Sequence, residues 1–122
     1  MAFKRQWRDY RTASGARPVK EFLDRLSDEE AADIVAGMKD VATHGLIAAR
    51  HLRGEIHEVR ADSRTRSFRL LFAKEGKYGQ VLLSLSAFEK RTQKTPPREI
   101  ELAERRLNDW RARGEAKKRL RT

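Results

Sequence analysis

Residues 56–73 read IHEVRADSRTRSFRLLFA, and this stretch decides the fold. The polar turn formers Asp62–Thr65 separate two segments with strand-like spacing, Ile56–Ala61 and Arg66–Ala73, so the stretch predicts a β-hairpin. Val81–Phe88 follows a turn that two glycines bracket and predicts a third strand. Consecutive apolar residues in the last two segments indicate central strands that are covered on at least one face.

Helical spacing precedes and follows these strands. Pro18 opens a helix with one apolar stripe, and Ser27 with Glu30 has the spacing of a capping box that begins a second helix. A third helix starts at Thr95–Pro97. Near the N-terminus, aromatic and charged residues at near-alternating positions predict an edge strand over Phe3–Arg11.

The order of these segments predicts one small α+β domain. A chain of 122 residues fits a single domain. We expect a β-α-α-β-β-β-α order over residues 1–114, in which two N-terminal helices and one C-terminal helix pack on a small antiparallel sheet. Residues 115–122 are expected to be a basic C-terminal tail.

The charge of the chain indicates the class of partner. Lys and Arg number 28 against 18 Asp and Glu, and 19 of the 28 are Arg, giving a formal net charge of +10. Residues 87–122 carry a net charge of +6, whereas residues 27–45 carry −4. Such a field favours phosphate polymers or acidic proteins over neutral ligands.

The composition also limits where the protein acts. The chain has no cysteine, which fits a reducing compartment. It has no apolar run long enough to cross a membrane and no signal-peptide core near its start. We therefore expect a cytoplasmic protein without a membrane partner. The three histidines lack the spacing of a metal site, so no metal or other cofactor is expected.

One arginine in the hairpin needs a counter-charge. Arg69 lies between Phe68 and Leu70 in an otherwise apolar strand, where a buried and unpaired arginine is costly. It therefore requires an ion pair, an exposed face or a ligand anion, and Glu58 across the hairpin is the candidate ion-pair partner. Because side chains alternate along a strand, Arg60 shares the face of Glu58.

A second basic cluster follows the third strand. Residues 87–103 read AFEKRTQKTPPREIELA and hold three cations and one aromatic ring within eight residues. A nucleobase can stack on Phe88 while the cations hold the flanking phosphates. A solvated basic linker is the alternative.

Residues 87–103 resemble the phage-derived HigB-like toxins of the RelE superfamily. Those chains carry a pattern close to Ala-Phe-x-Lys-Lys-Thr-x-Lys-Thr-Pro, followed by a helix with Glu-Ile-x-x-Ala. Residues 18–23, 52–60 and 68–72 agree with the same family, so the resemblance covers roughly residues 18–110.

The resemblance implies a RelE-like fold and the toxin of a type II toxin–antitoxin system. Such a toxin is an mRNA interferase, an endoribonuclease that cuts messenger RNA on the ribosome without a metal and so inhibits translation. The implied partners are a helix-turn-helix antitoxin, messenger RNA and the ribosomal RNA.

The resemblance also assigns roles to residues. In this cleavage the 2′-hydroxyl attacks the adjacent phosphate, so the site needs a base, an acid and charge stabilisation. The catalytic residues implied are Arg60, Arg69, Lys90 and Lys94, and those expected to bind RNA are Phe88, Arg91 and Arg66.

The sequence departs from the family pattern at positions that bear on proton transfer. Phe68 stands where the family often has Tyr, and Phe88 stands where many RelE-type nucleases have Tyr or His. Arg91 replaces the second lysine of the family pattern and cannot act as a base. The proton-transfer groups therefore stay open. His57 can serve only if the strand register brings it to the face of Arg69.

Two other functions remain open at this point. ParE-like members of the superfamily act on DNA gyrase and cut nothing, and a prophage-borne nucleic-acid-binding protein would share the basic charge. The Phe88–Lys94 cluster, which fits RNA chemistry, is the feature that discriminates a ribonuclease from the gyrase-directed toxins. A small helix-turn-helix protein encoded immediately downstream would support the toxin–antitoxin interpretation.

Overall fold

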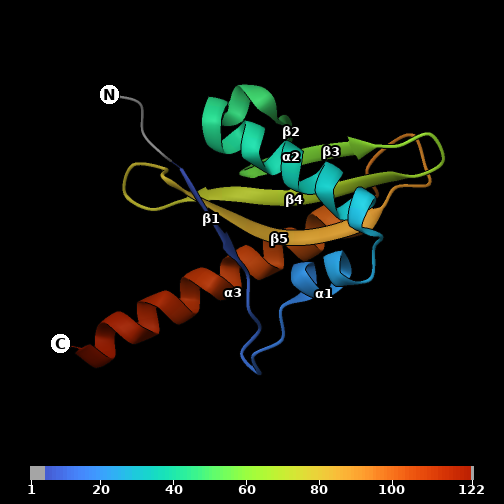
Figure 1. The fold of residues 1–122 in the computed structure, drawn as a ribbon. Helices are drawn as coiled ribbons and strands as arrows, with labels where there is room; N and C mark the ends of the chain where they lie inside the picture. Colours follow the sequence, from blue (N-terminus) through green and yellow to red (C-terminus); the bar gives the residue numbers. More distant parts are fainter. Residues whose placement is uncertain (1–4, 122) are drawn as a thin grey trace.

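The chain forms a five-stranded sheet with helices on both faces, in a computed structural model that describes residues 5–121 (Figure 1). Its elements are β1 (Gln6–Asp9), α1 (Pro18–Asp24), α2 (Asp28–His44), a 3-10 turn η1 (Gly45–Ala48), β2 (Arg50–Arg53), β3 (Ile56–Asp62), β4 (Ser67–Glu75), β5 (Val81–Glu89) and α3 (Pro97–Arg121). The predicted α+β class is confirmed, and so are the three helices and the three successive strands. Residues 3 and 4 of the expected edge strand lie outside the described residues.

The sheet differs from the prediction in two ways. Its strand order is β1-β5-β4-β3-β2, and β1 pairs with β5 in parallel, so the sheet is mixed rather than antiparallel. The chain passes from β1 to β2, at the opposite edge of the sheet, through α1 and α2 and not through a tight turn, so β1 can run parallel to β5. The predicted loop before Gly54 contains the extra strand β2, which pairs with β3 through a turn where Gly54 has φ +53°.

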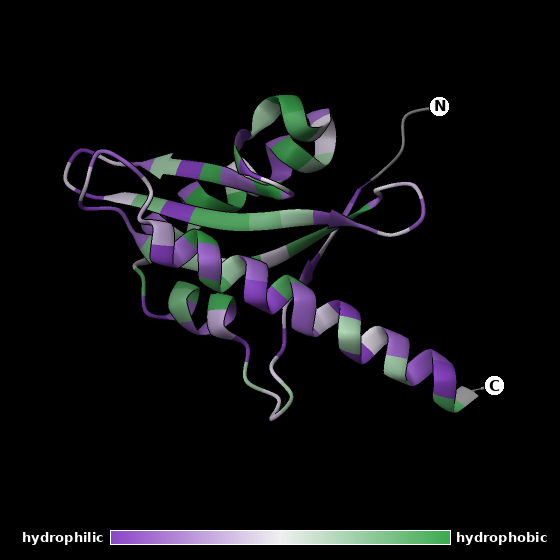
Figure 2. Ribbon diagram, turned by 180° about the vertical axis from the view of Figure 1, so that it is seen from behind, coloured by the Kyte–Doolittle hydropathy of each residue, from purple (hydrophilic) through white to green (hydrophobic). Residues whose placement is uncertain are grey.

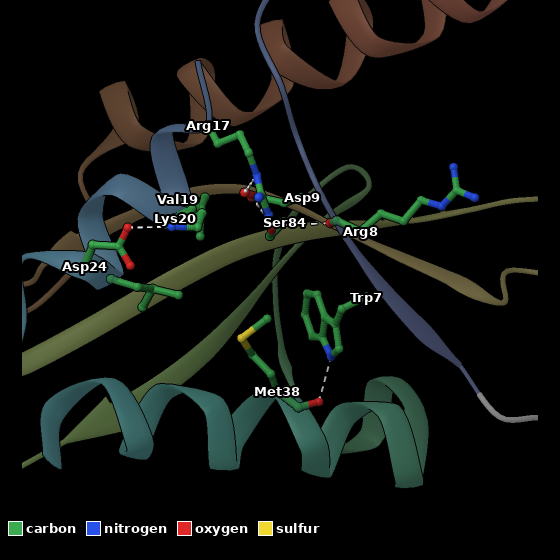
Figure 3. Close-up of a pocket in the computed structure, with 10 residues that line it drawn as sticks. Trp7, Arg8, Asp9, Arg17, Val19, Lys20, Asp24, Met38 and Ser84 are labelled. Carbon is green, nitrogen blue, oxygen red and sulfur yellow. Dashed lines mark hydrogen bonds and ion pairs between the residues drawn. The ribbon is translucent and has the colours of Figure 1, made fainter. Parts of the chain in front are cut away.

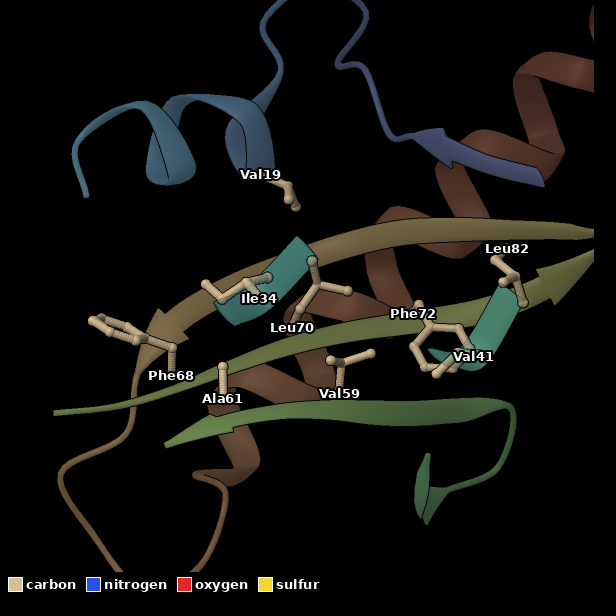
Figure 4. Close-up of a cluster of buried hydrophobic side chains, with 9 residues drawn as sticks. All are labelled: Val19, Ile34, Val41, Val59, Ala61, Phe68, Leu70, Phe72 and Leu82. Carbon is tan, nitrogen blue, oxygen red and sulfur yellow. The ribbon is translucent and has the colours of Figure 1, made fainter. Parts of the chain in front are cut away.

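The helices α1 and α2 cover one face of the sheet. Ser27 and Glu30 form the predicted capping box, since each side chain accepts a hydrogen bond from the other residue's backbone N–H, at 3.2 and 3.0 Å. The apolar side chains between these helices and the sheet form the first core cluster (Figure 4), whose buried members are Val19, Ile34, Val41, Val59, Ala61, Phe68, Leu70, Phe72 and Leu82.

The opposite face is covered by α3. Its buried residues Ala103 and Leu107 join a second core cluster that includes Ile56, Leu71 and Leu83 of the strands. Beyond the sheet the helix continues as a mostly hydrophilic rod (Figures 1 and 2), and residues 114–120 are exposed. Residues 115–121 of the expected tail therefore extend α3. Among the described residues, no helix combines the length and the apolar character that crossing a bilayer requires.

Candidate active site

A row of three side chains crosses the sheet on the α3 face. Arg60 of β3 is the register partner of Arg69 of β4, and Arg69 is the partner of Phe88 of β5. Alternation along β3 and β4 places these side chains on the face of Ile56 and Leu71, which belong to the second core cluster. The structure thus brings together the two arginines to which the family resemblance assigned phosphate chemistry.

Arg69 is almost completely buried and is held by two groups. Its side chain is 5% exposed, and its Nη1 donates hydrogen bonds to Asp62 Oδ1 at 2.7 Å and to the carbonyl of Phe68 at 2.8 Å. The predicted partner, Glu58, also faces it, but Arg69 Nε lies 3.6 Å from Glu58 Oε1. That separation makes an ion pair without a hydrogen bond.

Glu58 connects three segments of this site. Its side chain is 1% exposed, and its Oε1 lies 3.5 Å from Nε of Arg60. Its Oε2 accepts a hydrogen bond of 2.5 Å from the hydroxyl of Thr95, which lies in the segment between β5 and α3. Among the described residues, Glu58 Oε1 and Arg69 Nε are buried without a hydrogen-bond partner.

Lys90 is the candidate with an altered pKa. It lies directly after β5, where its N–H donates to the carbonyl of Ser67 at 2.7 Å. Burial lowers the pKa of Lys90, the positive charges of Arg69, Arg60 and Arg50 lower it further, and the negative charge of Glu58 raises it. A lysine with a lowered pKa is suited to proton transfer.

Lys90 and Lys94 line one cleft of about 210 Å³ beside β2. Its other lining residues are Arg50, Leu52, Gln93, Thr95 and Ile100. The lining therefore holds three cations, two apolar side chains and no acid. Such a lining suits a phosphate-bearing strand with a base against the apolar side chains.

The three residues predicted to bind RNA do not line this cleft. Phe88 is half-buried against the second core cluster. Arg66 lies on the α1–α2 face, where it pairs with Glu30 at 2.8 Å and Glu89 at 3.0 Å and stacks over Phe68. Arg91 also pairs with Glu89, at 3.0 Å, but it is largely exposed. RNA binding by these three residues stays a proposal.

The strand register does not bring His57 to the face of Arg69, which was the condition for a catalytic role of His57. Its register partner is Phe72, whose ring centre lies 5.7 Å away, and His51 lies 5.1 Å away on the other side. Phe72 belongs to the first core cluster, so His57 lies on the face opposite Arg69. It is therefore not placed to act on a phosphate held by the arginines.

A second hollow lies on the α1–α2 face. It encloses about 310 Å³ beside β1 and α1 (Figure 3). Arg17 pairs with Asp9 at 3.0 Å and Lys20 pairs with Asp24 at 2.7 Å, so two of its cations are already neutralised. This hollow is a poorer anion site than the cleft at Lys90.

Four contributors to the site were not singled out from the sequence as functional. They are Arg50, Asp62, Thr95 and the wholly buried carboxylate of Glu58. Alternation along β3 already placed Glu58 on the Arg60 face, and this was the available signal. Thr95 touches Glu58 across 37 residues of sequence, a contact that local patterns do not encode.

Comparison with known proteins places the chain in a family. The family described as Phage derived protein Gp49-like matches residues 21–108. The chain belongs to this Gp49-like family. It is also 36% identical over 107 residues to proteins named Probable endoribonuclease HigB1 from two strains of Mycobacterium tuberculosis, a match that covers 85% of this chain and 83% of each relative. The predicted membership among phage-derived HigB-like toxins is confirmed. The matched range includes Arg60, Arg69 and every residue that lines the cleft.

Proposed function

We propose that this Gp49-like chain is the toxin of a type II toxin–antitoxin system and an endoribonuclease that cuts messenger RNA on the ribosome. The observation that carries the proposal is that Glu58 links Arg60 and Arg69 to Thr95, which lines the same cation-rich cleft as Lys90. The relatives named as probable endoribonucleases support the same reaction class. A cognate helix-turn-helix antitoxin and the ribosomal RNA are the proposed partners, and the cytoplasm is the proposed location.

In the proposed reaction the RNA supplies its own nucleophile. The 2′-oxygen of one nucleotide forms a bond to the adjacent phosphorus while the bond from phosphorus to the 5′-oxygen of the next nucleotide breaks. One proton leaves the 2′-hydroxyl and one proton joins the departing 5′-oxygen. Lys90 is the proposed proton-transfer group, because its pKa is lowered and it lines the cleft.

The two arginines have different proposed tasks because their exposure differs. The side chain of Arg60 is 47% exposed and can contact the phosphate directly. Arg69 lies beside it on β4 with a 5% exposed side chain, so its charge acts through a low-dielectric interior. Both charges stabilise the extra negative charge that develops on the phosphate, and Lys94 and Arg50 hold flanking phosphates along the cleft.

Induced expression tests the proposal. We expect the wild-type chain to arrest growth and translation, with new RNA 5′-ends appearing inside coding sequences. Arg69→Ala should restore growth, and Arg69→Lys should impair the arrest because lysine lacks the planar fork. Arg64→Ala in the exposed β3–β4 turn removes the same charge outside the site and should stay toxic.

Two results would contradict the proposal. Normal growth with confirmed expression of folded wild-type protein would argue against a toxin. Growth arrest without new RNA ends would indicate a toxin with another target, such as DNA gyrase.

A further inference from the structure

We infer that Glu58 is a positioning residue of the proposed nuclease site, holding Arg60, Arg69 and the Lys90–Thr95 segment in their reactive arrangement. The inference rests on the proposed function and deepens it, since it assigns a role to a side chain that cannot itself reach RNA.

The burial of Glu58 first requires an explanation. A carboxylate that is 1% exposed has lost its hydration, which is costly unless its charge and both oxygens are compensated. Glu58 has cationic neighbours on β3 and β4 and a hydroxyl donor from the segment before α3. It is therefore the one acidic group through which these three segments are joined among the described residues.

The Oε1 atom of Glu58 is buried without a hydrogen-bond partner in the described part of the chain. This oxygen lies 3.5 Å from Nε of Arg60 and 3.6 Å from Nε of Arg69, so it is shared between two guanidinium groups. Orphaned buried polar atoms are rare and call for a functional explanation. A shift of a few tenths of an ångström would complete either contact. Glu58 thus holds both arginines close while leaving the exposed one available to a phosphate.

The other oxygen anchors the wall of the cleft. Thr95 donates its hydroxyl proton to Glu58 Oε2, and Thr95 and Lys90 both line the cleft. Figure 1 shows this connecting segment at the same end of the sheet as the β3–β4 turn. The hydrogen bond therefore fixes the position of a segment that otherwise contains four exposed residues, 91–94.

Glu58 also sets the charge around Lys90. The charged groups that act on Lys90 are Arg69 of β4, Arg60 and Glu58 of β3, and Arg50 of β2, and Lys94 shares its cleft. Glu58 alone among them is negative and raises the pKa of Lys90. Neutralising Glu58 lowers this pKa, so the limb of a pH–rate profile that reports Lys90 moves to lower pH whether Lys90 gives or takes the proton.

The test compares Glu58→Gln with the wild-type chain in single-turnover cleavage of ribosome-bound message across pH, with binding measured in parallel. Glutamine keeps the shape and an acceptor for Thr95 but removes the charge. We expect cleavage to fall roughly 10²-fold at saturating ribosome, as for a misplacement of about 1 Å, with binding little changed. The limb that reports Lys90 should move to lower pH.

Two further variants separate positioning from folding. Thr95→Val removes the hydroxyl donor without touching the buried charge and should lower cleavage without moving the pH limb. Glu104→Gln neutralises an acid that pairs with Arg53 away from the site and should change neither quantity.

The outcomes distinguish the two proposals. Absence of cleavage by the wild-type chain would refute the proposed function itself. A different result would overturn the positioning role of Glu58. In that result the wild-type chain cleaves, Glu58→Gln loses activity only in proportion to its unfolded fraction, and the variant keeps the wild-type pH profile.

Discussion

Arg60 and Arg69 are directly opposed across β3 and β4, and Glu58 and Asp62 occupy the two diagonal positions of the same face. Like charges directly opposite one another destabilise a sheet. Here the diagonal acids offset the repulsion, because Arg69 Nη1 bonds to Asp62 at 2.7 Å and both arginines lie near Glu58. The pattern Glu-x-Arg-x-Asp on β3 thus keeps two cations together on one face of the sheet.

The contact between Asp62 and Arg69 predicts a pH-dependent contribution to stability. The hydrogen bond from Arg69 is the main reason that the pKa of Asp62 lies below its ordinary value. Because the unfolded chain then binds the proton more tightly, this stabilisation is present above the unfolded pKa of about 3.9 and is lost as pH falls through the lower folded value.

Thermal unfolding of wild type and Asp62→Asn across pH measures this contribution. We expect the wild-type protein to melt higher at neutral pH, with the difference shrinking as pH falls below about 4. A difference that stays constant down to the acid-unfolding range would show that the charge of Asp62 does not stabilise the fold.

A close approach between α2 and β3 predicts the effect of a small substitution. A Cβ atom at Gly37 would lie 2.6 Å from Cγ1 of Val59, beside the strand that carries Arg60. Alanine normally stabilises a helix by about 1 kcal/mol relative to glycine, but overpacking costs about 1–3 kcal/mol. We expect Gly37→Ala to lower the free energy of unfolding by about 1 kcal/mol, as measured by denaturant titration.

Gly114 provides the matched control. It lies in the exposed part of α3, and a Cβ there meets nothing within 4 Å. Gly114→Ala should leave stability unchanged or slightly increase it. Equal stabilisation by both substitutions would mean that α2 can move away from β3 without cost.

Local patterns predicted the elements that depend on short-range chemistry. The capping box at Ser27 and the hairpin around residues 62–65 formed as expected, and the hairpin register placed Arg60 opposite Arg69. Ser63 supports this register, since its N–H and its hydroxyl both bond to the carbonyl of Arg66. The sequence therefore indicated these two arginines, and their action on a phosphate stays a proposal.

The features that sequence patterns missed depend on tertiary contacts. The parallel pairing of β1 joins residues far apart in the sequence, such as Gln6 and Val81, and β2 has only four residues, too few for a clear period. In β5 a bulge leaves Leu85 without a partner opposite β4, because Leu71 pairs with Ser86 and Phe72 with Ser84. The acids that bind Arg66 come from α2 and β5, which lie far from it in the sequence, so the sequence did not predict these ion pairs.

The basic face predicts how an antitoxin would associate. Lys90 and Lys94 line one cleft, and Arg60 is connected to its wall through Glu58 and Thr95, so an acidic antitoxin segment should be steered toward these cations. We expect the association rate constant, measured by stopped flow, to fall steeply as salt rises. An association rate that is independent of ionic strength would show that the antitoxin does not approach this face through charge.

The most direct test of the account separates chemistry from binding, by comparing Arg69→Ala with a chain that ends at Gly114 in single-turnover cleavage of ribosome-bound message. The truncation removes the exposed end of α3, including Lys117, Lys118 and Arg119, so it should weaken binding and reduce the salt slope by about one unit for each phosphate that the tail neutralises. It should still cleave at saturating ribosome. Arg69→Ala should bind nearly as wild type yet cleave ~10²–10³-fold more slowly, because it removes charge stabilisation in the transition state.

Folding must be verified in this comparison, because removing Arg69 leaves Glu58 less compensated and breaking a buried pair costs about 3–5 kcal/mol. Cleavage is therefore normalised to the folded fraction, measured by circular dichroism at the assay temperature. The placement of the active site at Arg60 and Arg69 would be contradicted by two results together. The truncated chain would lose cleavage at saturating ribosome, and folded Arg69→Ala would cleave as fast as wild type.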